Sequence, residues 1–275
     1  MFMTEKQPAL RVLAALIAIT ALIASATGVA WPDIYKSVAP DTEQPSVFGQ
    51  DLVSIAAAVA LLAIWKPQGA KANILRFGIV GYLFYAYAPY VMGTLYTGYY
   101  FLYLAVVGLT IFYFIVAFTG IDYAGTNLRM PTILRIVVAI YCAGIAVYFA
   151  PQWVTGILHN IRTHSGPAKT GFDLIYYVYI LDMCFVLPVC VIASVQLLQK
   201  KVLGAVLGGT LSVMGAILML SVAMGYFCQP LFHQTLDKAN AAQFSVLTFA
   251  FLVLSVFFFA DTKVERLQRR GDCDV

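Results

Sequence analysis

Charged residues are scarce in this chain. They make up 11% of its 275 residues, whereas hydrophobic residues make up 61%; a soluble domain carries about a quarter charged residues. The excess of basic over acidic residues, 17 against 13, is too small to indicate a nucleic-acid-binding surface. The composition therefore predicts an integral membrane protein that contacts the lipid bilayer and binds no nucleic acid.

Several signatures of cofactor and metal chemistry are also absent. No lysine or histidine lies inside a predicted span, which argues against a retinal Schiff base and against a haem-ligating bundle. No HExxH, Walker or GxSxG motif occurs, and the five cysteines form no CxxC pair. The histidines His159, His164 and His233 have no helical ligand spacing. We therefore expect no cofactor and no metal site.

Eight apolar stretches are long enough to cross a bilayer as helices, which takes ~20 residues each. They lie near residues 10–30, 50–65, 74–96, 99–118, 132–150, 173–198, 202–226 and 240–260. The first stretch is read as an uncleaved helix and not as a signal peptide, because its apolar run continues to Ala30. The predicted fold class is all-α, a polytopic membrane helix bundle that forms one transmembrane domain over residues 1–275.

The basic residues alternate between the two ends of these helices. Thirteen of the seventeen fall at one end: Lys6, Arg11, Lys66, Lys71, Arg76, Arg129, Arg135, Lys200, Lys201, Lys263, Arg266, Arg269 and Arg270. The other end has only Lys36, Arg162, Lys169 and Lys238. The positive-inside rule then predicts that both termini are cytoplasmic and that the protein is a multi-pass protein of the inner (cytoplasmic) membrane.

Asp182 is the most informative single residue, because it lies in the middle of an apolar span. A carboxylate at that depth costs several kcal/mol unless it is paired, hydrated or protonated. Tyr179 and Phe185, at i−3 and i+3, are expected on its helix face. Pro188 follows, and a proline there frees a backbone carbonyl where helices line a cavity. Asp182 is either a proton-titrating or ligand-binding carboxylate or a structural one bonded to a neighbouring tyrosine.

A second aspartate, Asp51, is expected to open the second helix directly after Gln50. One interpretation is a helix cap, since an acidic residue in the first turn favours the positive end of the helix dipole. The alternative is that Gln50 and Asp51 face inward and form the mouth of the Asp182 cavity.

Tyrosines follow one face of the third span, at four- and three-residue steps. They include Tyr82 and Tyr85, and Tyr103 follows on the next helix. Such a stripe packs helices together in the simplest interpretation. Tyrosine hydroxyls at depth need hydrogen-bond partners, however, and Asp182 is the deep acceptor at hand. The candidate ligand-binding residues are Asp182, Tyr179, Asp51, Gln50, Tyr82, Tyr85 and Tyr103.

Two further patterns concern the packing of the helices. The first and fifth spans both begin with Leu-Arg and end in a proline corner, which suggests two parallel four-helix halves, residues 1–125 and 126–275. Gly204 and Gly208 form a GxxxG, which indicates close helix contact either within the chain or in a homodimer.

The motifs Gly49 to Val53, Tyr82 to Gly93, and Asp182 with Pro188 make the chain resemble a family of prokaryotic multi-pass membrane proteins. The resemblance covers most of the chain and implies the same polytopic architecture, but it brings no agreed activity with it.

Three functions are left open by the residues. The first is small-solute or proton-linked transport, or ligand binding, at an outer-half pocket around Asp182. The second is an intramembrane enzyme that acts on a lipid or another hydrophobic substrate. The third is a structural or partner-binding membrane protein. A polar cavity that reaches Asp182 would favour the first two.

Overall fold

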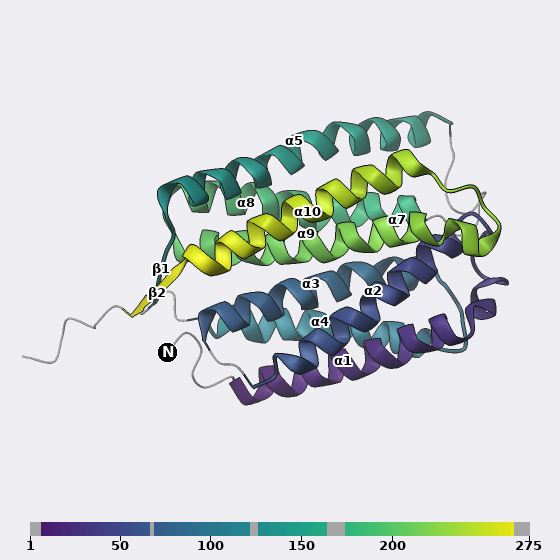
Figure 1. Cartoon of the computed structure of the whole chain (residues 1–275), viewed down its shortest axis with the longest axis horizontal. Coiled ribbons are helices and arrows are strands. Elements are labelled where there is room, and N and C mark those ends of the chain that lie inside the picture. The colour runs from purple at the N-terminus through teal and green to yellow at the C-terminus, as the bar shows by residue number, and fades with distance from the viewer. Residues whose placement is uncertain (1–6, 67–68, 122–125, 164–173, 267–275) are drawn as a thin grey trace, which may run out of the picture.

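The computed structural model describes residues 7–66, 69–121, 126–163 and 174–266. Several residues used above lie outside this range, namely Lys6, His164, Lys169, Arg269 and Arg270. The described residues form an all-α bundle that confirms the predicted fold class (Figure 1). Eight of its helices are long and apolar enough to cross a membrane.

The helices follow the chain in the predicted order. Four belong to the first half: α1 (Gln7–Ala30), α2 (Gln44–Ala63), α3 (Ala70–Met92) and α4 (Tyr100–Thr119). The second half has α5 (Thr132–Thr163), a sixth span made of α7 (Leu174–Leu181), the π-helical turn η2 (Asp182–Val186) and α8 (Leu187–Leu198), then α9 (Val202–Cys228) and α10 (Lys238–Asp261). Short 3-10 helices η1 (Pro32–Tyr35) and η3 (Gln229–Phe232) lie at the end predicted to be outside.

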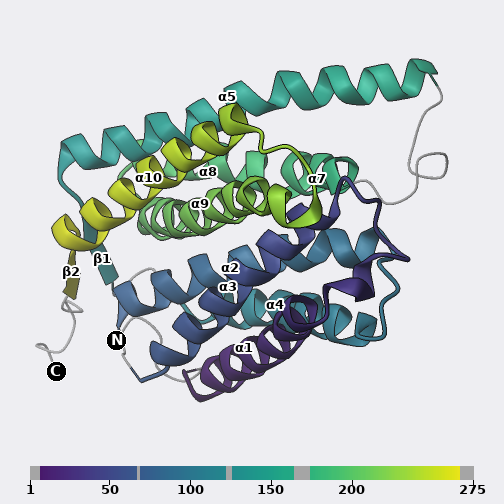
Figure 2. The same cartoon turned by 45° about the vertical axis from the view of Figure 1, so that its right-hand side comes forward.

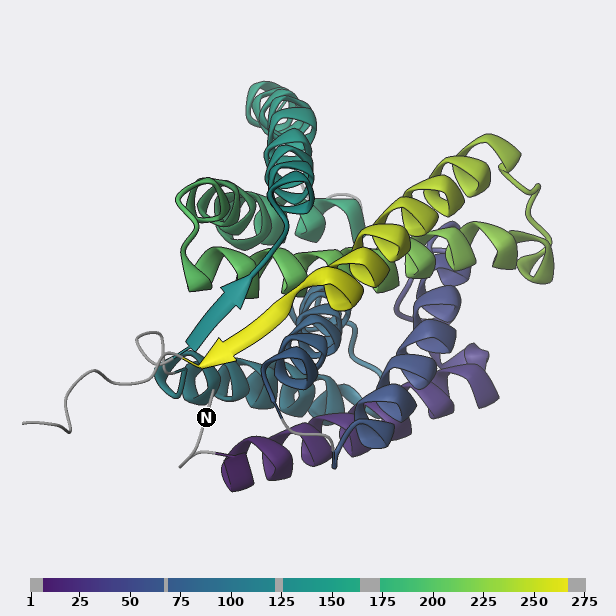
Figure 3. The ribbon, with the colours of Figure 1, turned by 60° about the vertical axis from the view of Figure 1, so that its left-hand side comes forward.

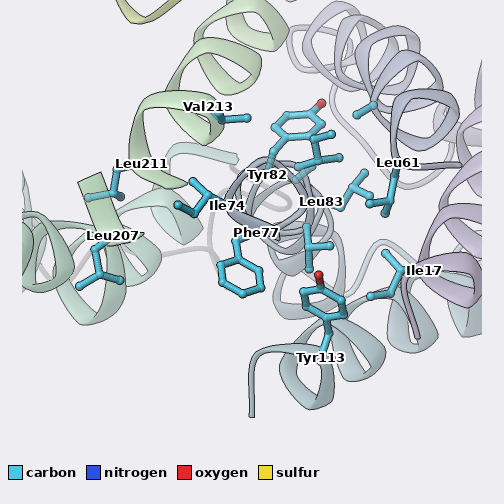
Figure 4. Packing of buried hydrophobic residues seen from close by; sticks show 14 of the residues in the cluster. Ile17, Leu61, Ile74, Phe77, Tyr82, Leu83, Tyr113, Leu207, Leu211 and Val213 are labelled. Atoms are coloured by element: carbon cyan, nitrogen blue, oxygen red, sulfur yellow. The ribbon is translucent and has the colours of Figure 1, made fainter. Parts of the chain in front are cut away.

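Helices α3 and α9 form the centre of the bundle and are the most buried of the eight spans. Figure 4 shows α3 side chains such as Phe77 and Leu83 facing Ile17 of α1 and Tyr113 of α4, while Leu211 and Val213 of α9 lie on the other side. The two halves of the chain therefore meet along α3 and α9, and α2 also packs against α9.

Glycines set the closest helix crossings. A side chain at Gly49 of α2 would collide with the backbone of Gly225 of α9, so the two backbones touch there. The predicted GxxxG also packs within the chain: Gly204 lies against the backbone of α8, and Gly208 against Leu197 and Val138. The close helix contact predicted from the GxxxG is therefore made within the chain, and the homodimer stays a prediction.

Helices α5 and α10 are the least buried of the eight spans, and many of their large apolar side chains are exposed on the outside of the bundle. They join at one end through a two-stranded antiparallel sheet of β1 (Thr126–Arg129) and β2 (Lys263–Arg266), with Leu128 paired to Val264. From there they diverge (Figure 3), and the C-terminal part of α5 projects beyond the rest of the bundle (Figure 2). The sequence did not predict the sheet.

Two predicted helix boundaries are wrong. Helix α2 begins at Gln44, with Pro45 in its first turn, where a missing N–H costs nothing. Asp51 is therefore two turns inside the helix, and the interpretation of Asp51 as a helix cap is wrong. Helix α5 continues through Pro151 to Thr163 instead of ending near residue 150. Its next turn is supported by a bond from the Gln152 side-chain amide to the Tyr148 carbonyl, 3.0 Å long.

Arg76, one of the basic residues at the end predicted to be inside, is buried. It lies inside α3, is 3% exposed, and donates from its guanidinium to the carbonyls of Ile64 (2.6 Å) and Trp65 (2.9 Å). These carbonyls end α2, and a cation at a helix C-terminus interacts favourably with the helix dipole. Arg76 thus fixes the junction between α2 and α3.

Candidate functional site

The sixth span changes its helical geometry at Asp182. Residues Asp182–Val186 form a π-helical turn, in which the N–H of Leu187 donates to the carbonyl of Asp182. Pro188 follows at once and has no N–H to continue the α-helical pattern. Single π turns inside α-helices are frequent at functional sites.

The wider turn changes which residues share a face with Asp182. Phe185, expected on that face, is instead 53% exposed on the outside of the bundle. Val186, Leu187 and Cys190 lie with Asp182 along one cavity wall. The expected i+3 spacing fails because a π turn holds one residue more than an α turn.

The Asp182 carboxylate is buried, 8% exposed, and both of its oxygens accept a hydrogen bond. The Tyr85 hydroxyl of α3 donates to Oδ1 over 2.8 Å. The Trp153 indole N–H of α5 donates to Oδ2, also over 2.8 Å. Residues of α3 and α5 thus position the carboxylate of the sixth span. Both donors are neutral, so neither hydrogen bond brings a positive charge to Asp182.

Asp182 lies in the wall of a cavity of about 860 Å³. This volume is in the range of small-molecule sites, which are mostly apolar with a few placed polar groups. Aromatic residues supply much of the wall: Tyr85, Tyr141, Tyr148, Phe149, Trp153, Tyr226, Phe244 and Phe251. Aliphatic side chains of α9, among them Leu211 and Leu218, also line it.

The cavity extends to the end of the bundle that is predicted to be outside. Thr42 and Glu43, directly before α2, and Gln229 of η3 line it there, and Thr42 is exposed. Gln50 lines it deeper, with its amide donating to the Ala86 carbonyl over 2.8 Å. The cavity thus connects Asp182 with the outer end.

The wall also contains Tyr141, whose buried hydroxyl has no hydrogen-bond partner among the described residues. Its ring packs edge-to-face on Phe251 at 4.8 Å between centroids. An unpaired buried hydroxyl costs about 1–3 kcal/mol. The hydroxyl oxygen is itself buried, so Tyr141 lines the cavity without exposing this oxygen to it.

Asp51 does not line this cavity. It is 1% exposed and accepts a hydrogen bond of 2.6 Å from the Tyr35 hydroxyl of η1. Burial, with the neighbouring Asp51 carboxylate, raises the pKa of Tyr35 well above its usual value, so Tyr35 remains a donor. The interpretation that Gln50 and Asp51 together form the cavity mouth is therefore wrong for Asp51.

The surroundings of Asp51 are a closed group of rings from η1, α3 and α4. Tyr90 lies 6.5 Å from Tyr35, 5.7 Å from Tyr87 and 5.3 Å from Tyr103 between ring centroids. All four rings are 1% exposed or less. We call Tyr35, Tyr87, Tyr90 and Tyr103 the tyrosine cluster.

The remaining candidates are distributed between these places. Tyr103 belongs to the tyrosine cluster, and Tyr82 exchanges a 3.0 Å hydrogen bond with Ser54 of α2. Tyr179 packs on Trp153 at 4.7 Å between ring centroids. Of the seven predicted residues, the structure brings Asp182, Tyr85 and Gln50 together in the cavity wall.

Trp153 is the main residue that sequence reasoning missed. The fifth span was expected to end before it, near residue 150, so it was not among the candidate residues. The signal that could have found it is the continued helical pattern beyond Pro151. Within the described residues, no group of three or more His, Cys, Asp or Glu side chains is placed to hold a metal ion.

Searches of known protein families, curated proteins and solved structures gave no match to this chain. The function is therefore argued from the geometry of the site.

Proposed function

We propose that the protein binds a small solute in the Asp182 cavity and that this site serves proton-linked transport across the inner membrane. The observation that supports the proposal best is the cavity of about 860 Å³, in whose wall neutral donors position both oxygens of Asp182. With the predicted orientation, solute enters from the extracytoplasmic side, past Thr42 and Glu43.

The charge state of Asp182 supplies the link to protons. A carboxylate without a cationic partner at membrane depth persists by protonation or by hydrogen bonding. The Trp153 N–H can only donate a hydrogen bond, whereas the Tyr85 hydroxyl can also accept one from the O–H of a protonated Asp182. The same pair of neighbours is therefore compatible with both protonation states, as a proton-exchanging carboxylate requires.

Access from the outer side is tested by cysteine labelling. Gly144 of α5 lines the cavity, and a side chain there meets no atom within 4 Å. In a chain whose own cysteines are replaced by alanine, Gly144→Cys should react with a membrane-impermeant maleimide added outside right-side-out vesicles, and much more slowly in inverted vesicles.

Gly108→Cys is the matched control. Gly108 lies within a span, on α4, is equally free of neighbours and does not line the cavity. It should resist the reagent from both sides, because thiolate formation needs water. Protection of Gly144→Cys from the outer reagent, or reaction only from the inner side, would contradict the proposed entry route.

A second candidate, an intramembrane enzyme or carrier for a lipid, is favoured by one observation. A shallower hollow of about 580 Å³ lies between α5 and α10 and shares Tyr148 and Leu247 with the main cavity. Its other lining residues, Ala239, Ala242, Gln243 and Val246, are exposed. This hollow offers a lateral route from the bilayer toward Asp182.

A further inference from the structure

The charges of the cavity wall are all of one sign. Asp182 and Glu43 are the two carboxylates among the described residues that line it, and this set includes no lysine, arginine or histidine. An anionic ligand would find no basic side chain there and would meet a carboxylate at mid-depth. Electrostatic complementarity therefore favours a positively charged ligand.

The aromatic groups next to Asp182 fit the same ligand. The Trp153 indole stacks on Phe149 (5.6 Å between centroids, 23° between planes) and also packs on Tyr179. Tyr85, Phe149 and Trp153 all line the cavity with Asp182. Cations are attracted to the faces of Trp, Tyr and Phe rings, and quaternary ammonium groups are recognised by such aromatic surfaces.

The size and the rest of the wall exclude a bare inorganic ion. A volume of about 860 Å³ is far larger than a dehydrated metal ion, and most of the α9 residues in the wall are apolar. A ligand that fills it needs an apolar body of several carbon groups, which would lie against Leu211, Leu218 and Phe251.

We propose that the Asp182 cavity takes a hydrophobic organic cation, a protonated amine or a quaternary ammonium, with its charge at Asp182 and against aromatic rings of the cavity wall such as Tyr148. This deepens the proposed function and rests on it. Because the cation and a proton compete for one carboxylate, binding to protonated Asp182 releases one proton: the Asp182 O–H bond breaks, the proton leaves to water, and the ammonium charge replaces it.

The groups that face Asp182 can be named helix by helix. Tyr85 comes from α3, Trp153 from α5, Tyr179 from α7 and Cys190 from α8. The described α9 and α10 residues of the wall add only the phenol of Tyr226 near the outer end. Asp182 is thus the one carboxylate among these groups.

The test uses the full chain in lipid nanodiscs made without choline lipids. Three probes share one phenylbutyl body: tritiated 4-phenylbutyltrimethylammonium, 4-phenylbutan-1-ol and 4-phenylbutanoate. We expect saturable binding of the ammonium and at least ~10-fold weaker competition by the alcohol and the carboxylate, since one lost charge interaction of ~1.4 kcal/mol is tenfold in affinity. Ammonium binding should weaken as the pH falls.

Variants locate the bound charge. Asp182→Asn should weaken ammonium binding by ~10-fold or more, and Tyr148→Ala, at an exposed cavity position, by a smaller factor. Gly144→Leu should block the cavity, whereas Gly108→Leu on α4 should bind as the unaltered chain does. Each variant is first checked for monodispersity and an unchanged unfolding transition.

The outcomes separate the two proposals. If the alcohol or the carboxylate binds as tightly as the ammonium, or if neither Asp182→Asn nor Tyr148→Ala changes ammonium binding, the cation inference is overturned. The proposed solute site then still stands if Gly144→Cys is labelled from outside. If no probe binds and Gly144→Cys is protected, both proposals fail.

The ammonium group can belong to a soluble molecule or to a lipid headgroup. Repeating the titration with phosphatidylcholine in the nanodisc distinguishes these sources. If phosphatidylcholine competes with the ammonium probe, Val246→Trp, in the hollow between α5 and α10, then tests the route. If that variant removes the competition, the lateral route and a lipid ligand are assigned. Undiminished binding would assign a soluble cation; both results retain the ammonium chemistry.

Discussion

The two membrane aspartates occupy opposite kinds of surroundings. Asp51 lies in the first half, where α1 packs on α2 and α4 and the tyrosine cluster fills the space. Asp182 lies in the second half, where α5 and α10 diverge and a cavity takes the place of such a filling. The same residue type is a structural anchor in one half and a candidate ligand group in the other. The predicted duplication of the halves itself stays a prediction.

The difference teaches that burial of a carboxylate does not by itself mark a binding site. Both aspartates are buried and both accept hydrogen bonds from tyrosine. What distinguishes them is space: Gly28 of α1 allows Asp51 and Tyr35 to pack directly against the α1 backbone, whereas Gly144 of α5 has nothing within 4 Å of a built side chain.

The largest effect is expected from filling these two spaces in parallel. A methyl group at Gly28 would collide with the Asp51 carboxylate and the Tyr35 hydroxyl. Gly28→Ala should therefore cost about 3 kcal/mol of unfolding free energy or prevent folding, since overpacked cores lose 1–3 kcal/mol and occasionally more. Reversible unfolding in mixed detergent and SDS micelles, followed by circular dichroism, measures it.

Gly144→Ala is the matched variant in the open half. It should be tolerated or should stabilise the chain by up to ~1 kcal/mol, because alanine is the better helix former. Equal losses for the two variants would mean that the cavity wall is as tightly packed as the tyrosine cluster, and the contrast between the halves would be lost.

A smaller effect is expected from removing the carboxylates themselves. Asp51→Ala leaves the Tyr35 hydroxyl buried without its acceptor, which costs about 1–3 kcal/mol. Asp182→Ala leaves the Tyr85 hydroxyl and the Trp153 N–H at a cavity where water can replace the lost oxygens, so the cost should stay below about 1 kcal/mol. The same SDS titration compares the two variants. An Asp182→Ala loss equal to that of Asp51→Ala would assign Asp182 a structural role, as in the third of the functions left open by the sequence.

The sequence predicted the number and order of the helices because each span is a long apolar run, and this signal is local. It failed where tertiary structure overrides local signals. Helix α5 continues past Pro151, where the Gln152 side-chain amide bonds the Tyr148 carbonyl, and α2 begins before the apolar run that marks it. Because these two boundaries were predicted wrongly, Trp153 was missed as a partner of Asp182 and Asp51 was interpreted as a helix cap.

The candidate site was foreseen in part. A hydrogen bond from a tyrosine of the third span to Asp182 could be predicted from the sequence, because a deep carboxylate needs a donor and that span is rich in tyrosine; the structure shows that this tyrosine is Tyr85. Packing between segments far apart in the chain decides the rest: which donors reach the Asp182 oxygens, which helices diverge and where a cavity remains. No periodicity distinguishes Gly28, which is packed, from Gly144, which is open.

The smallest effect is expected at Asp237, which caps the first turn of α10 on the open side. Its carboxylate accepts from the backbone N–H of Asn240 (3.1 Å) and from that residue's side-chain amide (2.7 Å). The backbone bond lowers the pKa of Asp237 below its usual value. A depressed folded-state pKa means that the stabilisation is present above the unfolded pKa, ~3.9 for Asp, and is lost as the pH falls through the lower folded value.

Asp237→Asn keeps a capping side chain and removes this pH dependence, whereas Asp237→Ala removes both. At neutral pH, Asp237→Ala should speed amide hydrogen exchange in the first turn of α10 and leave α4 unchanged, because α4 begins without a side-chain cap and is held by α1 and α3. As the pH falls below the folded pKa, exchange in the unaltered chain should approach that of Asp237→Ala after correction for the intrinsic rate. Faster exchange in α4 as well would show that the two halves open together, and the independence of the open half would be lost.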